Sequence, residues 1–330
     1  MLSTRFASRK SVCSTIRERI DAVTRAVKKT VIVLMNGSPV EMPWADRADA
    51  ILESGLCGQA GGKAIADILF GDVNPSGKLA ETFPEKLSDT PASLNFPGLR
   101  RRAEYREGVF IGYRYYEKKQ LKPLFPFGYG MSYTTFAYTG METDRSDFNE
   151  DQPLTIRIRV KNTGTRAGRE TVQLYVRDVT SSVPRPEKEL KGFSKAFLQP
   201  GEEKIVEFTL GRRAFAFYDE QIHGWRVETG EFEILAGGSS ADTPLKTTVT
   251  IHSIHREKTV FTRNSTIGEV LADPLGAQII RRVAVDRNHF SVEALPDFVL
   301  QMPLRSIRMQ IPEFNDEQIA RLTSVLNSER

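Results

Sequence analysis

The chain has 330 residues, which is long enough for two domains and a small third piece. Hydrophobic residues make up 40% of the sequence and charged residues 27%, so a packed core is expected and disorder is not. The formal net charge is only +4, and the lysines and arginines are scattered among acidic residues, which argues against nucleic-acid binding. Two cysteines do not indicate a disulfide framework, and no apolar run of about 18 residues is present to cross a membrane.

The first residues show no apolar stretch of the kind that a secretory signal contains. We therefore expect an irregular N-terminus over residues 1–15, and a cytoplasmic location if the start is genuine. The segment is rich in Arg and Ser and has no acidic residue before Glu18, which is a weak transit-peptide pattern. We prefer the simpler interpretation of a truncated or spliced start without a targeting role.

Residues 16–35 have the pattern of a helix followed by a buried strand. Apolar residues from Ile16 to Val27 recur at three- and four-residue spacing, which predicts an amphipathic helix over residues 16–29. The apolar run at residues 31–35 is rich in β-branched side chains and ends at Asn36-Gly37. It predicts a strand that is buried on both faces within a parallel sheet.

The residues that follow, up to 126, continue an α/β pattern. Residues 45–53 fit a short helix, but a second strand that begins at Ala50 fits equally well, and both remain open. Residues 63–70 predict a helix that ends at Gly71. The order of helix, strand and helix predicts a partial α/β sandwich, with a mostly parallel sheet, over residues 16–126.

From residue 127 to residue 252 the chain changes to short segments of strict alternation. Residues 154–160 alternate apolar and polar side chains, and a turn of Asn, Thr and Gly follows them. Further alternating segments lie at residues 172–177, 206–210, 225–227 and 232–235. Short strands separated by turns, with one apolar face, predict an antiparallel β-sandwich over residues 127–252.

The last part of the chain, residues 253–330, predicts a helical extension. Residues 267–280 and 315–326 have helical patterns, and the second begins with Asn, Asp and Glu, which are typical of a helix start. The stretch between the two helices shows no clear pattern, and the role of the extension is open.

The glycine-rich segment at residues 58–62 does not fit a nucleotide-binding motif. A phosphate-binding loop needs Gly, four residues, and then Gly-Lys-Ser/Thr. Counting back from Gly62, Cys57 occupies the first glycine position, and Ala64 replaces the hydroxyl residue that would hold magnesium. We expect instead that Gly61 and Gly62 let a helix begin close against a neighbouring strand.

No metal or organic cofactor is expected. The only close pair of histidines, His252 and His255, lacks a cysteine or a second pair that would complete a zinc site. The other histidines, His223 and His289, stand alone. The sequence also lacks the serine-nucleophile motif and places no histidine near either cysteine.

Carboxylates are the remaining candidates for catalysis. Six of them lie in the α/β part of the chain: Glu41, Asp67, Asp72, Glu104, Glu107 and Glu117. Hydrolysis of a glycoside needs two carboxyl groups about 5–5.5 Å apart for retention, or about 6.5–9.5 Å apart for inversion. The sequence gives no distances, so each acid taken singly is better explained as a cap, a salt bridge or a solvated side chain.

Four segments, in this order, resemble glycoside hydrolase family 3 of the β-glucosidase type: NGSPVEMPW (36–44), GQAGGKAIADILFGDVNPSGKLAETFP (58–84), YREGVFIGYRYYEKK (105–119) and PLFPFGYGMSYTTF (123–136). The sandwich resembles the fibronectin type III-like domain of that family through residues 160–176, 185–202 and 230–240. Residues 261–274 and 302–307 resemble an extension that some members carry. The resemblance covers roughly residues 16–310.

The resemblance implies an enzyme that hydrolyses terminal β-D-glucosides with retention, without a metal or organic cofactor. Family members usually carry an Asp nucleophile on a TIM barrel, and a Glu acid/base on a segment before the strand that corresponds to residues 31–35. A barrel takes about 250 residues, far more than precede Val31, and the acid/base segment has no match here. We therefore assign no catalytic residue, leave the substrate-binding residues unknown, and expect the chain alone to be inactive.

Two departures from the family pattern affect the loop that is expected to face the sugar. Ala60 stands where the family commonly has Glu, and Leu56-Cys57 stand where an aromatic residue and Pro are common. The expected partner is a β-glucoside if a barrel is supplied, while sugar and aglycone specificity and the oligomeric state are open. The alternative function is a non-catalytic module that binds carbohydrate or a protein partner through the β-sandwich.

Overall fold

The structure is a computed structural model that describes residues 16–100, 102–220, 222–254, 260–285, 295–307 and 315–328. The chain divides into two compact units, Met1–Ile254 and His255–Arg330. In the described residues, none of the helices combines the length and the apolar character that crossing a bilayer requires.

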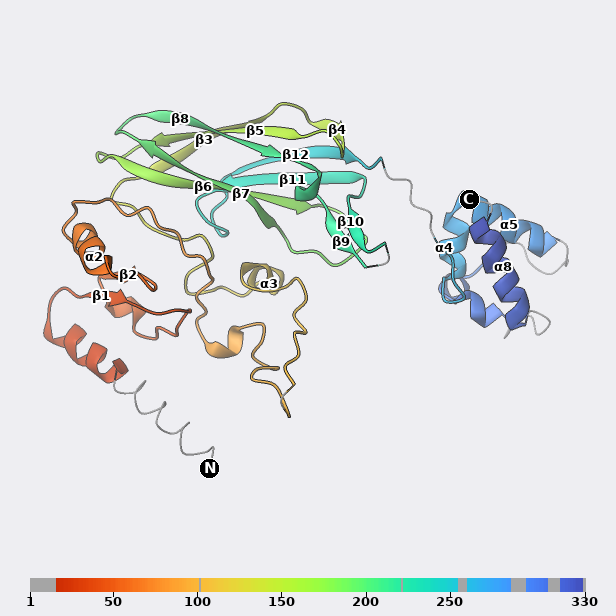
Figure 1. The fold of residues 1–330 in the computed structure, drawn as a ribbon, viewed down its shortest axis with the longest axis horizontal. Coiled ribbons are helices and arrows are strands. Elements are labelled where there is room, and N and C mark those ends of the chain that lie inside the picture. Colours follow the sequence, from red (N-terminus) through yellow and green to blue (C-terminus); the bar gives the residue numbers. More distant parts are fainter. Residues whose placement is uncertain are drawn as a thin grey trace. The chain divides into compact units, whose positions relative to one another are not determined.

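The first unit begins with an α/β layer (Figure 1). A helix covers residues 16–26 of the described chain. Strand β1 (Val31–Leu34) pairs in parallel with β2 (Ala50–Glu53), with Val31 opposite Ala50. The elements after the first helix are β1 (Val31–Leu34), the 3-10 helix η1 (Ala45–Arg47), β2 (Ala50–Glu53), α2 (Gly61–Leu69), η2 (Leu87–Asp89) and α3 (Tyr113–Lys118). Both alternatives for residues 45–53 are therefore present in succession, as a short 3-10 helix and then a strand.

The expected burial of β1 on both faces is wrong. Ile32 and Leu34 pack against the core of Met42, Trp44 and Phe83, but Val31 is 49% exposed and Val33 is 36% exposed. Within the described residues β1 pairs with β2 alone, so one face of this small sheet is uncovered. The run of apolar residues predicted the strand and its parallel pairing. It did not predict that the face with Val31 and Val33 would be exposed.

The glycines before α2 have different roles. A Cβ on Gly61 would lie 2.3 Å from Sγ of Cys57, whereas a Cβ on Gly62 would meet no atom within 4 Å. The close approach is therefore confined to Gly61 and is made by Cys57 in the preceding loop, not by a neighbouring strand as expected. Helix α2 ends before Gly71, whose φ of +83° suits glycine.

The predicted β-sandwich is confirmed. One sheet has the strand order β4-β12-β11-β6-β7 and faces a second sheet of β3-β5-β8, while β9 and β10 form a separate hairpin. Neighbouring strands are antiparallel except for the short β4, which runs parallel to β12. The strands are β3 (Phe136–Thr143), β4 (Asp147–Asn149), β5 (Leu154–Asn162), β6 (Gly168–Asp178), β7 (Glu189–Leu198), β8 (Glu203–Leu210), β9 (Phe217–Asp219), β10 (Gly224–Arg226), β11 (Gly230–Gly237) and β12 (Leu245–His252).

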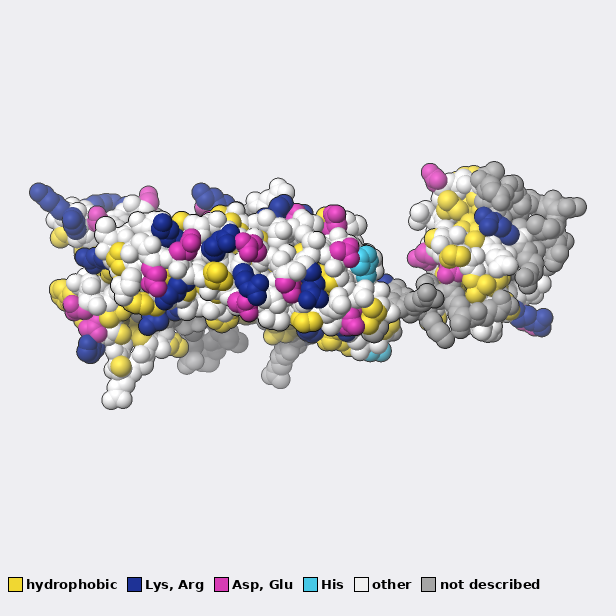
Figure 2. Space-filling model, turned by 90° about the horizontal axis from the view of Figure 1, so that it is seen from above, with side chains coloured by type: hydrophobic (Ala, Val, Ile, Leu, Met, Phe, Trp, Pro, Cys, Tyr) yellow, Lys and Arg dark blue, Asp and Glu magenta, His cyan; other side chains and the backbone are white. Residues whose placement is uncertain are grey.

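The core of the sandwich follows the alternation that the sequence predicted. The four apolar side chains of β5 are fully buried, and all belong to one cluster: Leu154, Ile156, Ile158 and Val160. On the outer side of the sheet that contains β3, β5 and β8, Lys and Arg are interspersed with Asp and Glu (Figure 2). Arg157 pairs with Glu207 at 2.9 Å on this side, and Arg159 pairs with Glu142 at 2.8 Å. This face therefore presents no stripe of a single charge.

The second unit is helical, as the sequence predicted. Its elements are α4 (Ile267–Ala272), α5 (Pro274–Val285), α6 (Asp297–Leu300), the 3-10 helix η5 (Leu304–Ser306) and α8 (Asp316–Ser328). The single helix expected over residues 267–280 is two helices, because Pro274 has no N–H to continue the first. A capping box starts α4: Thr266 Oγ1 accepts from the Glu269 amide at 3.1 Å, and the Thr266 amide donates to Glu269 at 2.7 Å.

Candidate functional site

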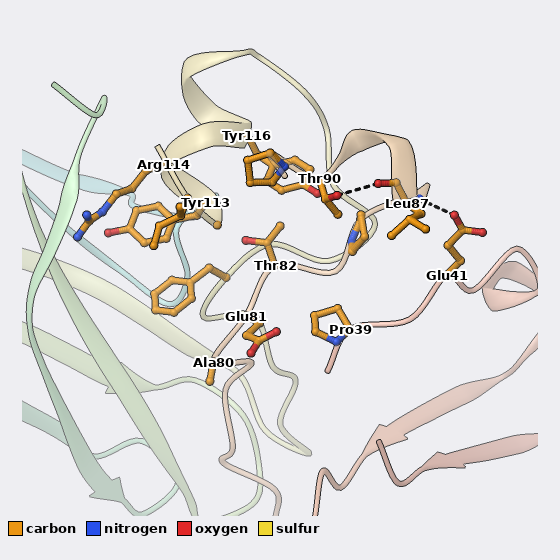
Figure 3. Close-up of a pocket in the computed structure, with 15 residues that line it drawn as sticks. Pro39, Glu41, Ala80, Glu81, Thr82, Leu87, Thr90, Tyr113, Arg114 and Tyr116 are labelled. Atoms are coloured by element: carbon orange, nitrogen blue, oxygen red, sulfur yellow. Dashed lines mark hydrogen bonds between the residues drawn. The ribbon is translucent and has the colours of Figure 1, made fainter. Parts of the chain in front are cut away.

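A cavity of about 540 Å³ lies in the first unit, between the loop after β1, the extended segment around residues 80–84 and the start of α3 (Figure 3). This volume is within the range of small-molecule sites, about 300–1,000 Å³. Twelve of its fifteen lining residues lie in the four family-like motifs, residues 36–44, 58–84, 105–119 and 123–136, and the other three are Leu87, Thr90 and Pro91.

One wall is an extended ribbon that pairs with a second segment. The Leu79 amide donates to the Tyr129 carbonyl at 2.8 Å, and the Phe83 amide donates to the Phe125 carbonyl at 2.9 Å. Phe83 also packs in the core beside Trp44. These contacts fix the backbone on both sides of Thr82, whose side chain lies at the cavity (Figure 3).

Helix α3 supplies the opposite wall and is tied to the sandwich. It begins after Gly112, whose φ of +53° favours glycine. The Tyr113 ring stacks on Phe127 with centroids 4.8 Å apart, and its hydroxyl accepts from the Leu190 amide at 2.8 Å. Three ion pairs then join α3 to the segment around β7: Arg114–Glu189 at 3.4 Å, Lys118–Glu187 at 3.0 Å and Lys188–Glu117 at 2.8 Å.

A polar network fixes the backbone next to Phe127, which lines the cavity. The Gln173 side-chain amide donates to the carbonyls of Gly128 and Gly238, at 3.0 Å and 2.6 Å. Gly128 has a φ of +78°, and a Cβ on it would lie 2.2 Å from Gln173 Oε1. Only glycine fits there, so the backbone can turn sharply next to the cavity.

The rim carries a carboxylate that is already bonded. Glu41 accepts a hydrogen bond from the Leu87 amide, and the Thr90 hydroxyl donates to the Leu87 carbonyl at 2.8 Å (Figure 3). The Glu41 carboxylate thus holds the loop after β1 to η2. Glu81 also lines the cavity and is exposed.

Two tyrosines of α3, Tyr113 and Tyr116, stay protonated at neutral pH. Burial, with a smaller effect of the Asp89 charge, raises the pKa of Tyr116 to about 12. Burial also raises the pKa of Tyr113, although the hydrogen bond from the Leu190 amide opposes this shift. Both hydroxyls can therefore act as hydrogen-bond donors.

Of the six carboxylates noted in the sequence, only Glu41 lines this cavity. Asp67 pairs with Lys63 one turn away on α2 at 2.6 Å, and Glu104 pairs with Arg106. Asp72 is exposed. Burial raises the pKa of Glu117, while Lys188 opposes the shift.

Apart from Glu41, sequence reasoning singled out none of the cavity residues, among them Glu81, Thr82, Tyr113, Arg114 and Tyr116. They lie inside segments that the sequence analysis recognised as motifs, but no spacing rule distinguished their side chains. The pairing of residues 79–83 with 125–129 is what brings them together, and it joins segments far apart in the chain.

Among the residues that the structure describes, no group of three His, Cys, Asp or Glu side chains could hold a metal ion. His252 instead contacts Asp147 Oδ1 at 3.0 Å through Nε2. Its expected neighbour His255 lies outside the described residues, as do His289 and Cys13.

Residues 12–133 match the glycosyl hydrolase family 3 C-terminal domain, and residues 170–240 match a fibronectin type III-like domain. These matches place the chain in the class of glycoside hydrolases. The chain belongs to glycoside hydrolase family 3. The domain bounds expected from the sequence, residues 16–126, 127–252 and 253–330, remain predictions.

Individual relatives support this family assignment. Thermostable β-glucosidase B of Acetivibrio thermocellus is 52% identical over 295 residues, which cover 87% of this chain and 39% of that protein. An exo-α-(1→6)-L-arabinopyranosidase of Bifidobacterium breve is 42% identical over 87% of this chain and 38% of its own length. The crystal structure of a family 3 β-glucosidase of Bifidobacterium adolescentis matches with a TM-score of 0.70 at 42% identity, over 80% of this chain and 39% of that one.

A further crystal structure, of a Kluyveromyces marxianus β-glucosidase in complex with glucose, matches with a TM-score of 0.67 at 44% identity. The match covers 71% of this chain and 28% of that one. The chain thus spans less than two-fifths of the length of each of these relatives.

Proposed function

We propose that this chain forms the C-terminal part of an enzyme that hydrolyses terminal β-D-glucosides with retention. The observation that carries the proposal is the 52% identity to thermostable β-glucosidase B over 87% of the chain. The arabinopyranosidase is less similar, at 42% identity over the same share. Both relatives are named as glycosidases. Hydrolysis of a glycosidic bond is therefore better supported than the identity of the sugar that is released.

Retention requires a nucleophilic carboxylate and a second carboxyl group that serves as acid and then as base. Four of the six acids noted in the sequence already have partners: Glu41 holds a backbone amide, and Asp67, Glu104 and Glu117 are in ion pairs. We propose that a barrel and an acid/base segment supply the catalytic pair, as the family resemblance implies. Residues 1–330 would then shape and support the site without turnover of their own.

The experiment is an assay of the purified polypeptide of residues 1–330 with an aryl β-D-glucoside. We expect no release of the aryl alcohol above a buffer control, because the covalent route needs both carboxyl groups. Turnover that is lost in Glu41→Gln, Glu104→Gln or Glu107→Gln would contradict the proposal, since it would place a catalytic acid within this chain.

The alternative of a non-catalytic carbohydrate-binding module has one observation in its favour. Tyr218 and Trp225 on the β9–β10 hairpin are 49% and 38% exposed, with ring centroids 5.2 Å apart. Arg213 covers part of the Trp225 ring, which leaves less of it free for a sugar. Binding would slow the migration of the protein through a gel that contains soluble β-glucan. This function would be favoured if Trp225→Ala abolished the slower migration and Phe193→Ala, at an exposed residue of β7, left it unchanged.

A further inference from the structure

The cavity beside α3 contains a buried hydroxyl that has no partner. Thr82 is only 7% exposed, and its Oγ1 makes no hydrogen bond within the described part of the chain. Buried polar groups in folded proteins are almost always paired, because an unpaired group loses its hydrogen bonds to water. Since the Thr82 side chain points into the cavity (Figure 3), a group that enters the cavity could supply the missing bond.

A second hydroxyl is available in the same cavity. The Tyr116 ring is 4% exposed, and its hydroxyl has no hydrogen bond with any described residue. A neutral hydroxyl can donate one hydrogen bond and accept others. Two such groups, one from the ribbon and one from α3, suit a ligand whose own groups both donate and accept.

The charged side chains of the cavity do not favour an ionic ligand. Arg114 pairs with Glu189, which also contacts Arg185 at 3.1 Å and Lys191 at 3.3 Å. Glu41 is bonded to the Leu87 amide. The exposed carboxylate of Glu81 at the rim can accept bonds from a ligand but would repel an anion.

Apart from Thr90, whose hydroxyl is bonded to the Leu87 carbonyl, the rest of the lining is mainly apolar, and much of it is rigid. The stacked rings of Tyr113 and Phe127 form one part, and three prolines form another: Pro39, Pro84 and Pro91. An apolar wall with a few placed polar groups is typical of a site for a small neutral molecule. A sugar ring has this character, because its C–H groups are apolar and its hydroxyls lie around the edge.

We propose that this cavity binds a neutral monosaccharide, with the Thr82 and Tyr116 hydroxyls bonded to hydroxyls of the sugar. The apolar wall contacts the C–H groups of the sugar ring, and Glu81 accepts a further hydrogen bond at the rim. No bond is made or broken at this site. The inference goes beyond the proposed hydrolysis and does not rest on it, because its readout is equilibrium binding.

The test is a titration of the full chain with D-glucose, in which binding is measured by ligand-observed NMR. We expect saturable binding, and we expect Thr82→Val to raise the dissociation constant about tenfold, because an isosteric methyl group cannot bond the sugar. Without sugar, the melting temperature of Thr82→Val should equal or exceed that of the wild type, since the lost hydroxyl had no partner.

A matched control is Thr134→Val, at a threonine that is 8% exposed and lies outside the cavity. The Thr134 hydroxyl donates to Asn162 Oδ1 at 2.7 Å, so this variant should melt at a lower temperature but bind glucose like the wild type. Tyr116→Phe gives a second test and should weaken binding in the same direction as Thr82→Val.

Three results would overturn the inference: no saturable binding of glucose, equal binding by wild type and Thr82→Val, or binding of inorganic phosphate or benzyl alcohol in preference to glucose. Each of them leaves the proposed hydrolysis standing, because none involves turnover. Failure of the hydrolysis proposal would equally leave a measured binding constant in place.

Discussion

At the scale of single residues, buried acids hold distant parts of the first unit together. Glu150 follows β4, and its side chain is fully buried. It accepts hydrogen bonds from Arg212 at 2.7 Å, from Ser253 at 3.0 Å and from the Ile254 amide at 2.9 Å. Burial by itself would raise the pKa of Glu150, but these donors outweigh burial and lower it.

The lowered pKa of Glu150 gives a prediction about pH. Since the folded state favours the charged carboxylate, Glu150 contributes stability above the ordinary pKa of Glu, about 4.3, and this contribution is lost as the pH falls through the folded pKa. Glu150→Gln should therefore lower the free energy of unfolding by about 2–4 kcal/mol at pH 7 and by clearly less at pH 3.

Urea denaturation at the two pH values measures this difference. Glu207→Gln is a suitable control, because Glu207 is 52% exposed in its pair with Arg157, and such pairs contribute roughly 0–1 kcal/mol. An equal effect of Glu150→Gln at pH 7 and pH 3 would show that the loss comes from packing and not from charge.

The residues of the cavity show the limit of prediction from sequence at this scale. Thr82 has no feature in the sequence that separates it from other threonines, because its burial depends on the ribbon formed with residues 125–129. Glu41 was noted as an acid, but its bond to the Leu87 amide could not be foreseen from the sequence. The family-like motifs indicate the region of the cavity, whereas the unpaired Thr82 hydroxyl depends on contacts between segments that are far apart in the chain.

At the scale of elements, β5 carries the core of the sandwich. Ile158 is fully buried between the sheets, and its neighbours in register are Met141 on β3 and Val206 on β8. Burial of such a side chain contributes about 1.5–3 kcal/mol. A charge at this position would be buried without a partner.

Ile158→Asp should therefore unfold the sandwich, with a loss above about 4 kcal/mol. Ile205→Asp on β8 is the matched control, because Ile205 is 60% exposed, and its cost should stay below about 1 kcal/mol. Circular dichroism melting curves of both variants separate them. A wild-type melting temperature for Ile158→Asp would mean that the assigned inner face of β5 is wrong.

The elements also differ in how far the sequence predicted them. Strand β5 was predicted together with its buried face, because alternation encodes burial directly. Strand β1 was predicted as a parallel strand, but its apolar run also implied a second covered face that the described residues do not provide. The break between α4 and α5 at Pro274 was missed because the apolar spacing continues through it.

At the scale of the whole molecule, the two layers of the first unit should differ in stability. The α/β sheet has two strands in the described chain, and its strand β1 has an exposed face, whereas β5 lies between two strands and is fully buried on one face. Regions with few buried apolar contacts open more readily than a packed core.

Hydrogen exchange of the monomer measures this difference. Amides of Val31–Leu34 should exchange much faster than those of Leu154–Val160, because among the described residues β1 has one unpaired edge and one uncovered face. The protein concentration should be varied as a control, since association through the exposed face would protect β1. Equal and strong protection of both strands in a monomer would contradict this account of the α/β layer.

The central claim, that this chain serves as the C-terminal part of a β-glucosidase, is tested most directly by a chimera. The matching region of thermostable β-glucosidase B, aligned over 295 residues at 52% identity, is exchanged for this chain, and hydrolysis of an aryl β-D-glucoside is measured. We expect the chimera to be active, and this chain without the rest of that protein to be inactive. A soluble, folded chimera without turnover would contradict the claim.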